Sequence, residues 1–183
     1  MYTSQADVTA YLQRELTASE AITLNPLISA VEKYIDSETG RRFIKTGSIA
    51  RYFDGTGAKE LFIDDAVAIT QVAEYDPETQ LSTVVASSEY ITRPYNKLPI
   101  SSIEFINGGL SRGTKNIKIT GEWGYCTTVP DDIKAIATFL VAQFYINPEN
   151  LKNENIEGYS RAFTDLLPPL FKSILDNLVK VTI

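Results

Sequence analysis

The hydrophobic pattern of this 183-residue chain changes twice, and that change constrains the fold more than any other feature. Residues 1–48 and 127–183 carry apolar side chains at intervals of three and four, as amphipathic helices do. Residues 49–126 are rich in Gly, Thr, Ser and β-branched types, and their apolar residues recur at shorter intervals. We therefore predict an α+β protein: mainly an α-helical bundle, made by the two outer segments, with an inserted small antiparallel β subdomain.

Two helices are predicted before the β-rich segment. Ser4 can cap the first, with Asp7 at the reciprocal position of a capping box. Residues 17–20 (TASE) resemble a break between helices. The second helix is expected to start at Asn25–Pro26, because Asn is a good N-cap and Pro suits the first helical position. Gly40 is a natural stop for it.

The β-rich segment divides into short runs separated by Gly, Pro, Asn and Asp. The predicted strands are residues 50–54, 60–63, 67–75, 82–85, 90–93, 103–106 and 116–120. Helical spacing returns at 131–146 and again at 169–179. The helix at 131–146 is apolar almost all round, which is typical of a helix at a bundle centre or a subunit interface.

The residue types that are missing exclude several kinds of chemistry. The chain has no histidine, so imidazole cannot act as a general acid or base, or activate a nucleophile. Cys126 is the only cysteine, which excludes an intrachain disulfide and a zinc site built from cysteines. The glycines match neither a phosphate-binding loop nor a dinucleotide fingerprint. We expect no enzyme activity, no cofactor and no metal site.

Two carboxylate pairs and one aromatic group were weighed as sites. Asp64–Asp65 and Asp131–Asp132 could hold a cation, but a strand-end turn and a helix N-terminus explain them better. Aromatic residues of the β segment alternate with Arg and Lys, a combination that can stack on single-stranded nucleic acid. A β core with a solvated outer face explains them better. These aromatic residues are Tyr90, Tyr95, Phe105, Trp123 and Tyr125.

An ordered set of segments resembles the head–tail connector (adaptor) family of tailed bacteriophages. The segments are YTSQADVTAYL, LISAVEKYIDSETGRRF, RYFDGTGAKELFIDD, NIKITGEWGY, VPDDIKAIATFLVAQFY and ENIEGYSRAF. The resemblance implies a non-enzymatic virion protein at the head–tail junction, assembled in the cytoplasm of a bacterial host. It implies a ring, expected to be dodecameric, that binds the portal protein, and a subunit that is monomeric in solution.

The same resemblance implies that the ring extends the DNA channel and offers a docking platform to the next connector, stopper or tail protein. DNA would pass through without specific binding, which agrees with the net charge of −6. No apolar run is long enough to span a membrane, so no membrane partner is expected. A tail-completion or stopper protein, and a ligand-binding module that uses the β insertion, are the alternatives.

A cyclic ring needs two different faces on each subunit. The helix at 131–146 and the C-terminal helix are expected to supply the bundle core and one of these faces. The tail at 179–183 is expected to contact a neighbouring copy or the portal, because its apolar residues would otherwise be exposed at a free terminus; a frayed or core-packed end is the alternative. The candidate interface residues are Phe139, Ile146, Val179, Val181 and Ile183.

Overall fold

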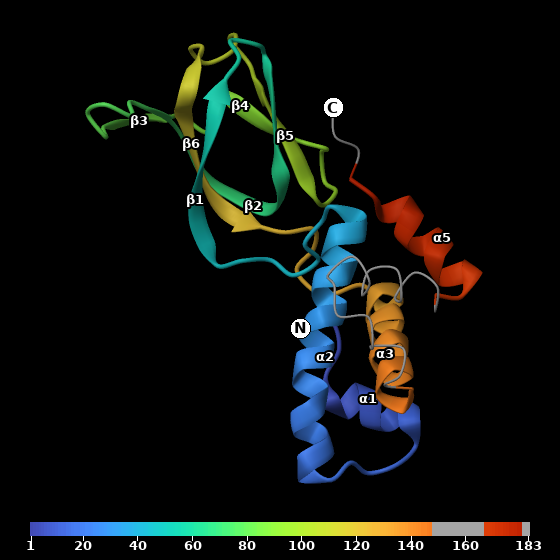
Figure 1. Cartoon of the computed structure of the whole chain (residues 1–183). Helices are drawn as coiled ribbons and strands as arrows, with labels where there is room; N and C mark the ends of the chain where they lie inside the picture. Colours follow the sequence, from blue (N-terminus) through green and yellow to red (C-terminus); the bar gives the residue numbers. More distant parts are fainter. Residues whose placement is uncertain (148–166, 181–183) are drawn as a thin grey trace. The chain divides into compact units, whose positions relative to one another are not determined.

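Figure 1 shows a computed structural model of the chain, in which residues 1–147 and 167–180 are described. In chain order the elements are α1 (Gln5–Leu12), α2 (Ala18–Thr39), β1 (Ser48–Gly55), β2 (Glu60–Tyr75), β3 (Ser82–Val85), β4 (Tyr90–Arg93), β5 (Ile100–Phe105), β6 (Gly113–Trp123), α3 (Asp131–Ile146) and α5 (Pro169–Leu178). The chain forms two compact units. The helical unit is Met1–Phe43 with Val129–Ile183, and the β unit is Ile44–Thr128.

The fold is a β-rich α+β fold, and the prediction of a mainly α-helical bundle is wrong. Among the described residues, 35% are helical and 32% are in strands, arranged as four helices and a six-stranded antiparallel sheet. The local pattern underestimated the strands because it predicted short, separate runs. Strand length depends on pairing with distant segments, which no local pattern reveals.

The start of α2 differs from the prediction. The helix begins at Ala18 after the N-cap Thr17, and Pro26 lies inside it. The segment TASE is therefore a capping box rather than a break: the Thr17 side chain accepts from the Glu20 backbone, and the Glu20 carboxylate accepts from the Thr17 backbone. The first helix has the capping box that was predicted, between Ser4 and Asp7.

Helix α3 lies at the centre of the helical unit and packs against both α1 and α2. It spans the predicted range, and its predicted apolar stripe is buried, as are the facing side chains of α2. The buried residues of the two helices are Leu24, Ile28, Val31, Tyr34, Ile35, Thr39, Ile133, Ile136, Ala137, Thr138, Leu140, Val141, Ala142 and Phe144. In α5, by contrast, only Leu175 is buried.

The sheet of the β unit has the order β1-β6-β2-β5-β4, and β3 pairs with β2 outside this path. Strand β2 is a single 16-residue strand, although the sequence predicted two strands here. Its first part pairs with β5, and its second part with β6 and β3. The adjacent acids Asp64 and Asp65 were predicted to form a turn at the end of a strand. Instead they lie within the strand, with Asp64 exposed and Asp65 buried.

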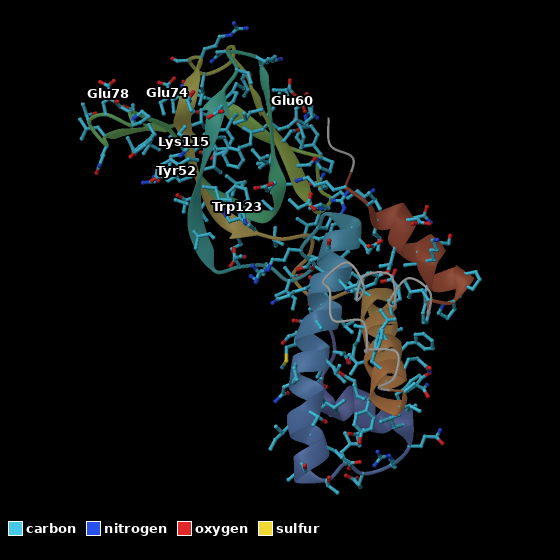
Figure 2. All side chains as sticks on the ribbon, in the orientation of Figure 1. Tyr52, Glu60, Glu74, Glu78, Lys115 and Trp123 are labelled. Atoms are coloured by element: carbon cyan, nitrogen blue, oxygen red, sulfur yellow. The ribbon has the colours of Figure 1, made fainter. Side chains whose placement is uncertain are left out.

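The core of the β unit collects side chains from β2, β5 and β6. Its buried members are Leu61, Ile63, Ala66, Val72, Ile100, Ile103, Phe105, Ile117, Ile119 and Trp123. The Trp123 ring lies 5.7 Å from the Phe53 ring, and its Nε1 donates to the Ile49 carbonyl at 2.9 Å. The indole of Trp123, labelled in Figure 2, is therefore part of this core, with its polar atom satisfied.

Candidate functional site

An apolar groove with a volume of about 460 Å³ opens on the surface of the helical unit. Its lining comes from α1, α3 and α5: Asp7, Tyr11, Asp131, Lys134, Ala135, Thr138, Phe139 and Phe171. The rings of Phe139 and Phe171 meet edge to face, with centroids 5.4 Å apart. This pair holds α5 against α3 on one side of the groove.

The groove has a charged rim. Lys134 Nζ lies 2.7 Å from Asp7 Oδ1, which joins α3 to α1 across one margin. Hydrogen bonds from Lys134 and then from Ser4 hold the pKa of Asp7 below its usual value. Because both side chains are partly exposed, salt and water screen the pair, and it orients the helices more than it stabilises them.

The predicted interface residues that are described lie in the helical unit. Phe139 is half-buried and lines the groove. Ile146 lies seven residues further along α3, so it is on the same helix face, and 55% of its surface is exposed. Val179 follows α5 and is 44% exposed. Val181 and Ile183 lie outside the described residues. The role of these residues as an interface stays a prediction.

The sequence interpretation missed two aromatic residues of the groove as site residues. In the sequence both Tyr11 and Phe171 fall on apolar stripes at helical spacing, which indicates core positions, yet Tyr11 is 49% exposed and Phe171 is half-buried. Leu170, next to Phe171, is 68% exposed. The strong amphipathicity of the segment 169–178 was the available signal, since a helix with a wide apolar face needs a surface to cover it.

A polar network joins the end of α3 to the start of α2. Arg14 Nη2 lies 2.9 Å from Glu20 Oε1, and the Tyr145 hydroxyl donates to the same oxygen at 2.6 Å. The Arg14 guanidinium, and next the Tyr145 hydroxyl, hold the pKa of Glu20 far below its usual range. The network fixes the α1–α2 connection against the last turn of α3.

The carboxylate pairs have structural partners. Asp64 accepts from Arg51 at 2.6 Å, and Asp132 accepts from the backbone of Ile133 at 2.8 Å. Asp54, at the start of the Gly-containing turn, accepts from the backbone of Lys115 at 2.7 Å. Within residues 1–147 and 167–180, no group of three or more potential metal ligands comes together.

The aromatic residues of the β unit do not share one face. Trp123 and Phe105 are buried in the core, whereas Tyr95 is 55% exposed. The guanidinium carbon of Arg93 lies over the Tyr95 ring, 4.1 Å from the ring centroid. A stacking platform for bases needs several exposed rings in a row. The arrangement of these residues therefore gives no support to the ligand-binding alternative.

None of the described helices is both long and apolar enough to cross a bilayer.

Three solved structures with a similar fold are chains of gene transfer agent (GTA) particles. No protein-family model and no curated protein matches the chain. A chain in the neck of an empty GTA particle, computed with C6 symmetry, matches with a TM-score of 0.68 and 15% identity, covering 97% of this chain and 89% of that one. A chain in the neck of a native GTA particle, computed with C12 symmetry, has a TM-score of 0.63 and 16% identity over 96% and 89%.

A third similar chain belongs to the virion of a native gene transfer agent (GTA) particle. Its TM-score is 0.62 at 18% identity, with 92% of this chain and 81% of that chain covered. At this level of identity the likeness establishes the fold alone. The shared fold includes both units, because nearly the whole chain is covered in each comparison.

Proposed function

We propose that this chain is a structural subunit of the neck of a phage-like particle, and specifically a head–tail connector (adaptor). In this role twelve copies form a ring that binds the portal protein. The ring extends the DNA channel and presents a docking surface to the next connector, stopper or tail protein. The helical unit and the β unit would be its two domains, and the ring would be part of the virion.

The observation that carries the proposal is the match of fold over almost the full length of this chain and of the neck chains. A shared motif would arise in many proteins, whereas the combination of an inserted six-stranded sheet with the four helices in the described part of the chain is far more restrictive. Two of the similar neck structures were computed with C6 and C12 symmetry, which fits a cyclic assembly.

The surface of the helical unit supports the same role. The groove beside Phe139 and the exposed Leu170 both offer apolar surface on the helical unit. Apolar surface of this kind is typical of protein–protein contacts. The net charge of −6 suits a subunit past which DNA has to move without sticking.

The proposal is tested by measuring mass in solution. The purified chain, the portal protein from the same genome and their mixture are examined by light scattering and native mass spectrometry. We expect the chain alone to be a monomer and the mixture to contain a portal ring carrying one copy per portal subunit. Absence of binding at all salt concentrations would contradict the adaptor role and favour a tail-side completion or stopper protein.

A further inference from the structure

Four neighbouring strands of the β unit form a part of the sheet that is bounded by two outer edges. The order across these strands is β1–β6–β2–β3. In one row Tyr52 of β1 pairs with Lys118 of β6, which pairs with Ala73 of β2. Ala73 pairs in turn with Val84 of β3. Among the described residues, β1 pairs only with β6 and β3 only with β2, so both outer edges have backbone groups available for another strand.

Strand β1 lacks most of the features by which proteins usually protect an exposed strand. Such features are short length, proline, lysine or a local bulge. Strand β4, at the other end of the sheet, has only four residues and is followed directly by Pro94. In contrast, β1 keeps a regular register over residues 48–53 and contains no Pro or Lys. Strand β3 (STVV) is as short as β4, but it contains no Pro and no charged residue, and no proline follows it directly.

Exposed apolar side chains stand at both edges in the same row. Val84 is 58% exposed at one edge, and Tyr52 is 45% exposed at the other. Ala73, two strands from β1 and next to β3, is only 1% exposed. A strand added at either edge would cover the outer side chain, and an aromatic residue opposite a β-branched residue is a favourable cross-strand pair.

The charges beside the two edges are opposite. From residue 60 to residue 92 the sequence has no Lys or Arg. We call the β2–β3 hairpin, residues 72–85, the arm; it carries Glu74, Asp76 and Glu78, two of which are labelled in Figure 2. Hydrogen bonds from Thr79 and the turn backbone lower the pKa of Asp76, which keeps it charged.

Basic residues of β6 lie one strand in from the other edge. Lys118 pairs directly with Tyr52 of β1, and the backbone of Lys115 donates to Asp54 at the end of β1. Lys115 is exposed and Lys118 is half-buried. The register of the strands places the turn of the arm, which follows Tyr75, and the segment around Lys115 at the same end of the sheet. An acidic edge and a basic edge at the same level are complementary between two copies of the chain.

Strand direction also permits the contact. Neighbouring strands in this part of the sheet are all antiparallel, so β3 runs opposite to β1. A second copy related by rotation about a ring axis can therefore place its β1 beside β3 as an antiparallel pair. The contact uses two different edges, which is the heterologous arrangement that closes into rings.

We propose that β3 of each copy pairs with β1 of the next copy, with the acidic arm against the Lys115 and Lys118 side, so that the sheets join around the ring. This inference rests on the ring of the proposed function and identifies its subunit contact. The occupant of each edge is thus a second copy of this chain. Val84 of one copy lies opposite Tyr52 of the next.

Engineered disulfides test this contact. The variant Val84→Cys with Tyr52→Cys is made in a Cys126→Ser background and oxidised in the presence of the portal protein. Within one chain the two positions are three strand spacings apart, about 14 Å, which is too far for a disulfide. We expect a ladder of covalent oligomers on a non-reducing gel that ends at the ring. Either single cysteine variant, and the control Tyr52→Cys with Thr92→Cys on β4, should give no ladder.

A small shift in register is covered by two further pairs. Ala50→Cys or Asp54→Cys replaces the change at Tyr52, because positions two residues apart point to the same face. Charge reversal gives an independent readout: Lys115→Glu or Glu78→Lys should lower the cross-linking yield at least tenfold, and the two together should restore it.

The outcomes separate this inference from the proposed function. If the cysteine variants bind the portal, as measured by mass, but no pair of positions gives a ladder, the edge contact is wrong and the adaptor role stands. A ladder that stops at dimers would also overturn the contact, because it indicates pairing of like edges. If the chain neither binds the portal nor cross-links at high concentration, both the adaptor role and the edge contact fail.

Discussion

The hydroxyl of Tyr145 donates a hydrogen bond of 2.6 Å to the carboxylate of Glu20, although 125 residues separate them in the chain. The same carboxylate takes part in the capping box of α2 and binds Arg14. One side chain therefore links the start of α2, the α1–α2 connection and the last turn of α3. Because these contacts are stronger when the carboxylate is ionised, the stability of the network depends on pH.

The first prediction concerns Glu20→Gln. The pKa of Glu20 in the folded chain lies far below its ordinary value of 4.5, so the unfolded chain binds the proton first as the pH falls. The stabilisation is thus complete well above pH 4.5 and declines as the pH falls below it. We expect the difference in unfolding free energy between the natural chain and Glu20→Gln to shrink on acidification.

Urea unfolding between neutral and acidic pH measures this difference. Glu15→Gln is the matched control, because Glu15 is an exposed acid in the same connection and lies outside the network. A difference for Glu20→Gln that stays constant with pH would show that the carboxylate charge has no role.

The second prediction concerns the N-cap of α2. Thr17→Ala removes the side-chain oxygen that accepts from the Glu20 backbone at 3.3 Å. Loss of such a cap costs about 1 kcal/mol of unfolding free energy. Ser19→Ala, at an exposed position in the first turn, should change it by less than about 0.5 kcal/mol. Equal midpoints for the two variants in urea would contradict the position of the helix start.

That helix start illustrates what the sequence could and could not predict. The same motif type was recognised at Ser4 and Asp7 but not at Thr17 and Glu20, because Asn25–Pro26 offered a second, equally regular start. Either start satisfies the local rules for caps. The earlier start brings Leu24 into the helix, where it is fully buried one turn before Ile28 and extends the packed face of α2.

The β unit shows the same division between local and non-local information. Strands β3 and β4 were predicted with their observed bounds, because turn residues on both sides define them. The continuity of β2 was not predicted, because its two parts pair with different strands. The groove beside Phe139 was also not predicted, because three helices from distant parts of the sequence form it.

The third prediction concerns close approach of two loops in the β unit. A Cβ atom at Gly109 would lie 2.0 Å from the carbonyl oxygen of Ala58, so Gly109→Ala forces the β1–β2 turn to move. We expect a loss of roughly 1–3 kcal/mol in unfolding free energy. Gly47→Ala is the control, because nothing lies within 4 Å of a Cβ at that position. Thermal unfolding of both variants measures the effect, and an equal stability of the two would mean that the loops separate freely.

The last prediction concerns the candidate interface residues of the helical unit. Ile146→Asp and Val179→Asp each place a charge on an exposed apolar position, at 55% and 44% exposure. We expect the unfolding free energy of the free chain to be unchanged, because neither side chain is in the core. Binding to the portal ring should weaken at least tenfold if the contact buries the new charge without a partner. Native mass spectrometry of titrated mixtures measures the binding.

The matched control for this prediction is Ile22→Asp. Ile22 is 71% exposed on α2 and was not among the predicted interface residues. An equal loss of binding for all three variants would mean that added negative charge acts at long range on association, since such an effect does not depend on position. Unchanged binding for Ile146→Asp and Val179→Asp would remove both residues from the interface. A loss at these two positions alone would place the portal or a neighbouring copy against this face, because only local burial distinguishes them from Ile22.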